Sequence, residues 1–512
     1  MPNRDAMKAY EAAVDLFAAR GVDTVFTLLS EEIIELVSTM QDERADEFRV
    51  VHCRHEQGAA AMADGFSRAG DGIGVCIVGR GPAIAQTGTS LVTASNNGSR
   101  VLYVVPETKR TTAHDGKGFE QTTYLETMVG EVDSVRSPER VVPALSEALY
   151  RIRAGEGPIA VQVPTDVLAA EVAEDSVEAL GAPPRAPQDA RVEPEASTVE
   201  AAVDLYLDSD ATKAPVIVAG RGAVASGAKD AIEALAERLG AYLVTSARAM
   251  GYFSDHPFGL GFAGDLGSDL ANEYVMEADY VLGIGAGLNH HTVDSGHLLA
   301  EGAKVVHVDT DPGRIGRFTE VDVGIVGDAR VTAEALTAAL DELGIERADE
   351  FWTEKVRRRV EEHDQFTDRE FEDVPGTIDP RDLVRALDDA LPSDRFVVSD
   401  VGHFGNWVFD GFSLAPTDHL LWTVDFLSLG QALPMSIGAA LAEDGRTTIT
   451  VCGDGGLMMV LQELETAARN DVPLVVVVFN DEALGAEYHM AKMRGHSGTV
   501  GQIPAPDFAN VA

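Results

Sequence analysis

Short runs rich in valine, isoleucine and leucine recur along the whole chain, and helix-like segments separate them. This alternation is typical of parallel sheets that are covered by helices, so it predicts an α/β fold. Ligands of such sheets bind at the carboxyl ends of the strands, and polar residues just after each run are therefore the first candidates for a functional site. The runs that we expect to be buried strands are residues 75–78, 101–105, 216–219, 280–284, 305–308, 448–451 and 474–479.

Two polar, proline-containing stretches, 181–187 and 352–375, divide the chain into three such blocks. The 512 residues are enough for three domains with well-buried cores. We therefore expect three doubly wound parallel-sheet domains, at residues 1–175, 191–345 and 376–512.

The chain is strongly acidic, with 84 Asp and Glu residues against 40 Lys and Arg residues and a net charge of -44. Such a charge repels nucleic acid and anionic membranes, so we expect neither as a partner. It suits a halophilic protein in a salt-rich cytoplasm, where ions screen the self-repulsion. The alternative is an acidic protein from an ordinary cell.

Neither a membrane helix nor a secretory signal is expected. No apolar run approaches the length of a membrane helix, and the first residues lack the apolar core of a signal peptide. The cysteines Cys53, Cys76 and Cys452 show no paired spacing. This usage indicates a reducing, cytoplasmic location without a disulfide framework.

The strongest motif is Gly453-Asp454-Gly455-Gly456, which directly follows one predicted strand. A helix and a second strand come next, and that strand ends at Asn480-Asp481. Glycines after a strand let the backbone approach a phosphate, and Asp454 and Asp481 would then meet at neighbouring strand ends. Two carboxylates together with phosphate oxygens suit Mg²⁺. The alternative is two ordinary turns rich in Gly and Asp, and the strand–helix–strand spacing argues against it.

Residues 453–481 resemble the thiamine diphosphate (ThDP) binding motif of the acetolactate synthase, pyruvate decarboxylase and benzoylformate decarboxylase family. Asp481 stands where that family has Asn, which keeps an oxygen donor but adds a charge. The resemblance implies a Mg²⁺ site made by Asp454, Asp481 and the backbone carbonyl of Ala483. It also implies that ThDP contacts Asp454, Gly455, Gly456, Asp481 and Leu484.

The segment Arg54-His55-Glu56-Gln57-Gly58 resembles the family's Arg-His-Glu motif. By that resemblance Glu56 touches N1′ of the aminopyrimidine ring of ThDP and helps to remove the C2 proton of the cofactor. The alternative is an exposed glutamate at the start of a helix. The match of the surrounding residues favours the catalytic interpretation.

Gly79-Arg80-Gly81-Pro82 corresponds to the loop that lines the substrate cavity in relatives, and Gln86 falls beside the thiazolium ring. Arg80 is unusual at its position. Its guanidinium would bind a substrate carboxylate, or it is a surface Arg or forms a salt bridge to Glu107.

His114 and Gln121 lie in a loop that borders the active site in relatives. His114 would shuttle protons, or it is a solvated loop residue. Glu31 and Glu32 occupy a turn that is rich in glycine in relatives, and we expect them to cap or solvate the next helix.

Two further segments of the third block follow the family pattern. Residues 400–403 resemble the loop on the diphosphate side, with Gly402 and His403 at the cofactor. Residues 427–434 align with a segment in which Leu429 supports the bent conformation of ThDP from below. Plain core packing is the alternative for Leu429, and it is compatible with that role.

The central block resembles a domain that binds FAD in acetolactate synthases. Those enzymes carry an Arg-containing stretch where this chain has residues 287–291, so we expect no tightly bound FAD. Fold alone does not imply a nucleotide.

The resemblance covers almost the whole chain and implies pyrimidine-binding, central and diphosphate-binding domains. ThDP would bridge the first domain of one chain and the third of another, which requires a homodimer or homotetramer. The implied function is decarboxylation or carboligation of a 2-oxo acid, by a lyase or a transferase.

Two alternatives remain. A true acetolactate synthase large subunit is less favoured, because Met490 replaces a specificity Trp and residues 164–166 lack that subfamily's Lys. A catalytically silent ThDP-binding paralogue is the other. Relatives continue beyond residues 507–512, so the chain either trims an element there or is a fragment.

Overall fold

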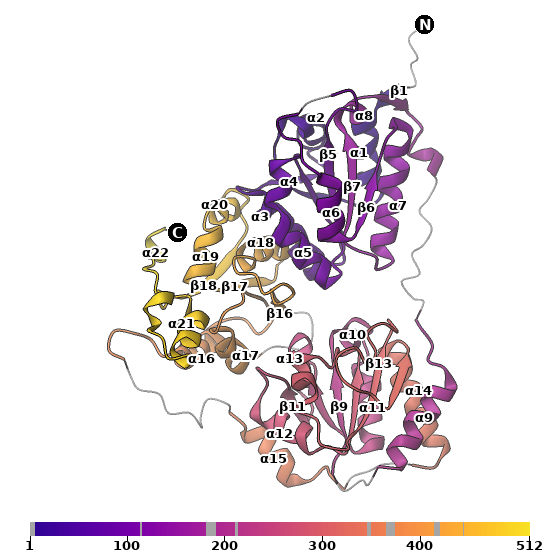
Figure 1. Ribbon diagram of the computed structural model, residues 1–512, viewed down its shortest axis with the longest axis vertical. Coiled ribbons are helices and arrows are strands. Elements are labelled where there is room, and N and C mark those ends of the chain that lie inside the picture. The colour runs from indigo at the N-terminus through magenta and orange to yellow at the C-terminus, as the bar shows by residue number, and fades with distance from the viewer. Residues whose placement is uncertain are drawn as a thin grey trace. The chain divides into compact units, whose positions relative to one another are not determined.

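The computed structural model describes residues 6–112, 115–180, 191–209, 213–345, 350–364, 374–413, 420–443 and 445–511. They form two compact units. One is drawn from residues 1–188, 394–405 and 421–512, and the other from 189–393 and 406–420. The predicted α/β fold is confirmed, because three separate sheets with parallel strand pairs are each covered by helices (Figure 1).

The N-terminal sheet of the first unit has the strand order β3-β2-β4-β5-β7-β6, and all of its pairs are parallel. The predicted strands at 75–78 and 101–105 correspond to β4 and β5. The strands are β2 Thr24–Leu28, β3 Arg49–His52, β4 Gly74–Val78, β5 Val101–Glu107, β6 Glu131–Ser134 and β7 Ile159–Pro164. The main helices are α1 Ala9–Ala19, α3 Glu56–Ala69, α4 Pro82–Gln86, α5 Gly88–Asn97, α6 Gln121–Val129 and α7 Val141–Arg153.

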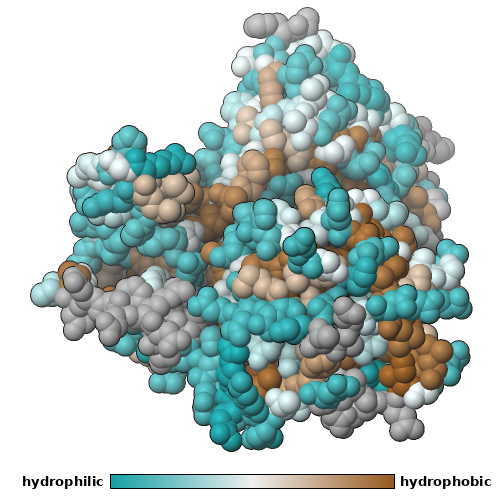
Figure 2. Space-filling model, turned by 60° about the horizontal axis from the view of Figure 1, so that its bottom comes forward, coloured by the Kyte–Doolittle hydropathy of each residue, from teal (hydrophilic) through white to brown (hydrophobic). Residues whose placement is uncertain are grey.

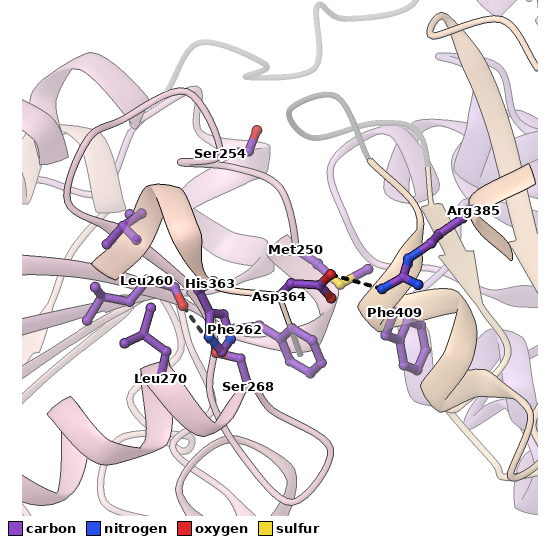
Figure 3. Close-up of a pocket in the computed structure, with 14 residues that line it drawn as sticks. Met250, Ser254, Leu260, Phe262, Ser268, Leu270, His363, Asp364, Arg385 and Phe409 are labelled. Carbon is purple, nitrogen blue, oxygen red and sulfur yellow. Dashed lines mark hydrogen bonds and ion pairs between the residues drawn. The ribbon is translucent and has the colours of Figure 1, made fainter. Parts of the chain in front are cut away.

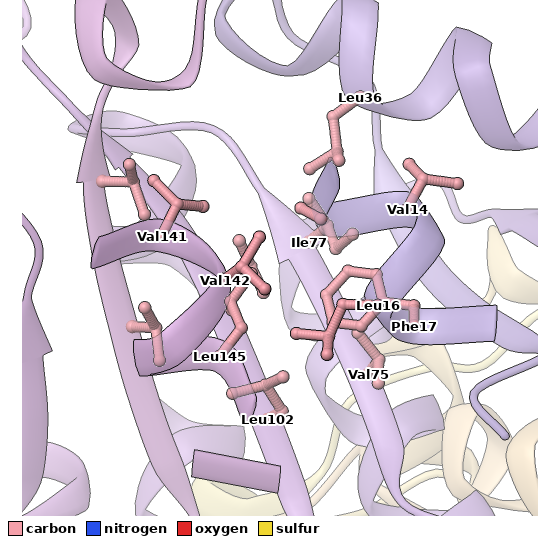
Figure 4. Packing of buried hydrophobic residues seen from close by; sticks show 14 of the residues in the cluster. Val14, Leu16, Phe17, Leu36, Val75, Ile77, Leu102, Val141, Val142 and Leu145 are labelled. Carbon is pink, nitrogen blue, oxygen red and sulfur yellow. The ribbon is translucent and has the colours of Figure 1, made fainter. Parts of the chain in front are cut away.

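Apolar side chains fill the space between this sheet and helices α1 and α7 (Figure 4). Phe17 of α1, Ile77 of β4 and Leu145 of α7 are each 1% exposed or less. Complete burial of such a side chain contributes about 1.5–3 kcal/mol. This core explains why the runs of Val and Ile in the sequence become central strands.

The C-terminal sheet belongs to the same unit and has the strand order β16-β15-β17-β18. The neighbours β15, β17 and β18 are parallel, so their carboxyl ends lie at one edge. The strands are β15 Arg395–Ser399, β16 Leu420–Trp422, β17 Thr447–Gly453 and β18 Leu474–Phe479. The helices after β16 are α18 Ala432–Ala442, α19 Asp454–Val460, α20 Glu463–Arg469 and α21 Gly485–Met493.

The helices α3 and α18 pack against each other and join the two sheets of the first unit (Figure 1). A Cβ atom on Gly65 would lie 2.1 Å from the backbone oxygen of Met435. A Cβ atom on Gly438 would lie 1.9 Å from the backbone oxygen of Met62. Both helix backbones therefore approach each other at a distance that only glycine permits.

The second unit contains a parallel sheet with the order β11-β10-β9-β12-β13-β14. The strands are β9 Val216–Ala219, β10 Tyr242–Thr245, β11 Gly259–Phe262, β12 Tyr280–Ile284, β13 Lys304–Asp309 and β14 Val323–Val326. The longer helices are α9 Ala196–Leu207, α11 Lys229–Leu239, α12 Asp269–Glu277, α14 Ala329–Glu342, α15 Glu354–Glu362 and α16 Pro380–Ala390.

Among the helices of both units that the structure describes, none is both long and apolar enough to cross a membrane.

Candidate active site

The glycine-rich motif forms the turn between β17 and α19. Gly453 precedes the helix, and the N–H of Gly455 donates to Oδ1 of Asp454 over 2.8 Å. A Cβ atom on Gly456 would lie 2.6 Å from Oδ2 of Asp400. The turn therefore leaves no room for a side chain at position 456.

Asp454 and Asp481 lie close together, because β17 and β18 are parallel and Gly453 is opposite Phe479. Burial raises the pKa of Asp454, and the negative charge of Asp481 raises it further. Within the described residues, no Lys or Arg pairs with either carboxylate. His403 lies beside them, with its Nε2 at 3.5 Å from Oδ2 of Asp481. Two adjacent carboxylates without a strong cation fit a divalent metal ion.

His403 is half-buried beside these two carboxylates, and Gly402 before it is exposed. Burial lowers the pKa of His403. A Cβ atom on Gly485 would lie 2.0 Å from Cε1 of the His403 ring, so the ring is held against the start of α21. The structure thus brings His403 together with the two predicted metal ligands.

Asp400 begins the loop that the sequence places on the diphosphate side, but no role was predicted for it. Its buried carboxylate accepts hydrogen bonds from the N–H groups of Gly430 (2.7 Å) and Val401 (3.1 Å) and from the hydroxyl of Thr423 (3.0 Å). Burial raises the pKa of Asp400 to about 6. Asp400 therefore fixes the loop before α18 beneath the glycine turn. It directly follows β15, a strand that was not among those predicted from the sequence.

That loop carries Leu429, which is partly buried next to Gly430. Gly430 and Leu427 both have a positive φ, of 76° and 52°. Leu427 and Met459 of α19 are each 60% exposed. The surface near Leu429 therefore includes exposed apolar side chains. Figure 2 shows one face of the molecule, on which most of the surface is hydrophilic and hydrophobic residues form separate patches.

Glu56 is the first residue of α3. The ring Nδ1 of His55 accepts a hydrogen bond from the N–H of Gln57 over 3.1 Å and so caps the helix. Glu56 is partly buried, and no described residue hydrogen-bonds to its carboxylate. Among the described residues of one chain, the Glu56 side chain also makes no hydrogen bond or ion pair with the Asp454 segment. Gln86 at the end of α4 is exposed.

Arg80 is committed to ion pairs. Its Nε lies 3.2 Å from Oε1 of Glu32, and its Nη1 forms a short contact with Asp115. The alternative prediction of a salt bridge between Arg80 and Glu107 is wrong, because Oε2 of Glu107 lies 2.6 Å from Nη1 of Arg136. The prediction that Glu32 is solvated is also wrong, because its side chain is only 3% exposed.

Gln121 secures the loop around Arg80. Its Oε1 accepts from the N–H of Gly81 over 3.0 Å, and its Nε2 donates to Pro106 O and to Oε1 of Gln162. The amide of Gln121 is therefore used for holding the loop. His114 lies outside the described residues.

The second unit has a cavity of about 440 Å³ that is lined by Phe262, His363 and Phe409, among others (Figure 3). Arg385 and Asp364, which also line it, form an ion pair in which Nη2 lies 2.9 Å from Oδ2. None of the predicted cofactor residues lines this cavity. It is therefore not the site that the sequence predicts.

Two histidines of the segment that replaces the FAD-associated stretch lie against carboxylates outside it. His291 Nδ1 lies 3.2 Å from Oδ2 of Asp265, and His290 Nδ1 lies 3.1 Å from Oδ1 of Asp294. The pairing with Asp265 raises the pKa of His291. Each imidazole thus has a carboxylate partner, and the lack of FAD stays a prediction.

Comparisons with known proteins decide the family. Models of thiamine pyrophosphate enzymes match the N-terminal TPP binding domain at residues 7–128, the central domain at 210–336 and the C-terminal TPP binding domain at 400–512. A probable 2-ketoarginine decarboxylase of Pseudomonas aeruginosa is 32% identical over 95% of this chain and 84% of its own length. The chain belongs to the thiamine pyrophosphate enzymes.

Other thiamine pyrophosphate enzymes are similar over nearly the whole chain. A probable acetolactate synthase large subunit of Methanocaldococcus jannaschii is 28% identical over 99% of this chain and 86% of its own. A sulfoacetaldehyde acetyltransferase of Castellaniella defragrans has the same identity and coverage. The family predicted from the sequence is confirmed, and thiamine pyrophosphate, which is ThDP, is its cofactor. The relatives differ in their reactions, so the family does not define the substrate.

Proposed function

We propose that this chain catalyses the ThDP- and Mg²⁺-dependent decarboxylation or carboligation of a 2-oxo acid. The observation that carries the proposal is the approach of Asp454 and Asp481 at the carboxyl ends of β17 and β18. The Glu56 carboxylate at the start of α3, which has no hydrogen-bond partner among the described residues, supports it.

Asp454, Asp481 and the carbonyl of Ala483 would hold Mg²⁺, and the turn at Gly455 and Gly456 would receive the diphosphate. The second carboxylate at position 481 strengthens the attraction for a cation, since ligand charge governs the affinity of such sites. It also increases the repulsion between the two side chains when no cation is bound, and this repulsion adds to the effect of burial in raising the pKa of Asp454.

ThDP, when bound, supplies the carbon nucleophile for the carbonyl of the substrate. Glu56 would hold a proton at N1′ of the aminopyrimidine ring, and Leu429 would support the cofactor from the side of the α18 loop. His403, with Gly402, would lie at the diphosphate.

The substrate side is formed by the Arg80 loop, Gln86 and Gln121, with His114 as a proton donor or acceptor. Since Arg80 already pairs with Glu32 and Asp115, it would bind a substrate carboxylate only by exchanging a partner. We therefore assign to Arg80 the shaping of the loop first, and substrate binding second.

The site would be completed by a second chain, in a homodimer or homotetramer. Two observations support this. Glu56 makes no described contact with Asp454 in its own chain, and apolar side chains around Leu429 are exposed. A partner that brings its own Glu56 would cover this surface.

A screen of 2-oxo acids with purified protein, ThDP and Mg²⁺ in concentrated KCl tests the function. Pyruvate and 2-ketoarginine are the first substrates, because relatives are named for acetolactate synthesis and for 2-ketoarginine decarboxylation. We expect CO₂ release with at least one acid, and none from Asp454→Ala. Acetolactate from pyruvate would identify the acetolactate synthase alternative. Tight ThDP binding without CO₂ from any acid would support the silent paralogue.

A further inference from the structure

Glu463, the first residue of α20, reaches from the C-terminal sheet to the segment before Glu56. Its two carboxylate oxygens lie 3.2 and 3.3 Å from the backbone nitrogen of Arg54, which donates to them. The backbone N–H of His55 also donates to this carboxylate. The hydroxyl of Thr466 donates to it over 2.7 Å. One buried carboxyl group thus accepts hydrogen bonds from the two amides immediately before the predicted catalytic residue.

The position of Glu463 is unusual for a carboxylate. The residue is 0% exposed, and no Lys or Arg side chain pairs with it among the described residues. Burial raises its pKa. A Cβ atom on Gly58 would lie 2.5 Å from Glu463 Oε1, so the first turn of α3 leaves room for this carboxylate only because residue 58 is glycine. Burying such a group is costly unless its hydrogen bonds are made.

Two other residues of α20 hold the same segment. Glu465 Oε2 lies 2.6 Å from Nε of Arg54, and Arg469 donates to the backbone oxygen of His52 over 2.6 Å. These two contacts are exposed, whereas the contact of Glu463 with Arg54 is partly buried. Three residues of α20 therefore bond to the segment 52–55, and Glu463 makes the most buried of these contacts.

We propose that Glu463 is a positioning residue that fixes the backbone of Arg54 and His55 and thereby places Glu56 for catalysis. This inference rests on the proposed function of Glu56. It gives the diphosphate-binding domain a second function. The helix α20 of that domain would position Glu56 of its own chain, and this Glu56 would act in the active site shared with the partner chain.

The first test measures backbone protection in the protein without cofactor. Glu463→Ala should increase amide hydrogen exchange at Arg54 and His55 by at least tenfold, since both amides lose their acceptor. Glu463→Gln keeps an acceptor and should show a smaller increase. Glu465→Gln is the matched control, because it removes the exposed ion pair to Arg54 and leaves both backbone hydrogen bonds. Unchanged exchange in Glu463→Ala would overturn the proposal.

The second test measures exchange of the C2 proton of bound ThDP. Glu463→Ala should slow it by about 10- to 100-fold, the scale of a misplaced catalytic group, and leave ThDP affinity within about threefold of wild type. Glu463→Gln should recover most of the rate. A loss of rate that follows a loss of ThDP affinity in both variants would show that Glu463 serves the diphosphate site, contrary to the proposal.

The third test uses mixed dimers. Glu56→Gln chains mixed with Asp454→Ala chains should regain activity at the one site with both good residues. Adding Glu463→Ala to the Glu56→Gln chain should leave that activity unchanged. Adding it to the Asp454→Ala chain, which supplies the good Glu56, should reduce it 10- to 100-fold. The reverse order would overturn the proposal. If the parent mixture stays inactive, the shared site is wrong, and the first two tests still decide the role of Glu463.

Discussion

Nη2 of Arg68 lies 2.7 Å from Oδ2 of Asp425, and both side chains are 5% exposed or less. Nε of the same Arg68 lies 2.8 Å from Oδ1 of Asp64. Arg68 stands near the end of α3, and Asp425 stands in the loop that carries Leu429. This buried group therefore anchors the loop that carries Leu429 to the helix that begins with Glu56.

Arg68→Met should destabilise the protein by about 3–5 kcal/mol, because it leaves two carboxylates buried without their cation. Chemical denaturation at constant salt measures this. The triple variant Arg68→Met, Asp64→Asn, Asp425→Asn removes the stranded charges and should recover most of the loss. A loss below about 1 kcal/mol for the single variant would mean that water reaches the group and replaces the guanidinium.

Asp400 should make stability depend on pH. Its folded pKa, about 6, is above the usual value for Asp, so the folded state binds a proton more readily than the unfolded state. Its contribution is therefore complete below about pH 4 and is lost as pH rises through 6. The free energy of unfolding of wild type minus that of Asp400→Asn should fall between pH 5 and pH 7. A difference that grows over this range would contradict the prediction.

Asp481→Asn should reduce the negative charge beside Asp454. We expect the cation-free protein to melt at a higher temperature, and the Mg²⁺ concentration needed for half-maximal ThDP retention to rise about tenfold. Glu482→Gln is the control, since it removes one charge from the adjacent residue, whose backbone N–H rather than side chain contacts Asp454. If both variants shift the Mg²⁺ requirement equally, the effect is only that of net charge.

The net charge of -44 should make the folded state depend on salt. Raising KCl from dilute buffer to about 2 M shortens the range of repulsion to a few ångströms, so the melting temperature should rise. Sucrose at matched osmolality serves as the control, because it stabilises without screening charges. An equal melting temperature in dilute buffer and in KCl would rule out the halophilic interpretation.

Local patterns predicted much of this protein. The β-branched runs became β4, β9, β12 and β17, and the glycine turn at Asp454 lies at a strand end, since both signals depend on neighbours in the chain. Contacts between distant segments were not predictable in the same way. The hydrogen bond of Glu463 to Arg54 joins residues 409 positions apart. Nothing near Arg80 in the sequence shows that Glu32 and Asp115 are its partners.

The glycine pair in the contact of α3 with α18 limits how this protein can be recombined with its relatives. Gly65 faces the backbone at Met435, and Gly438 faces the backbone at Met62. Each helix therefore requires a glycine at one position of the other helix. A chimera that takes its first domain from one enzyme and its third from another would combine two helices that were not selected together. Library designs should therefore move α3 and α18 as one block, and place crossover points outside them.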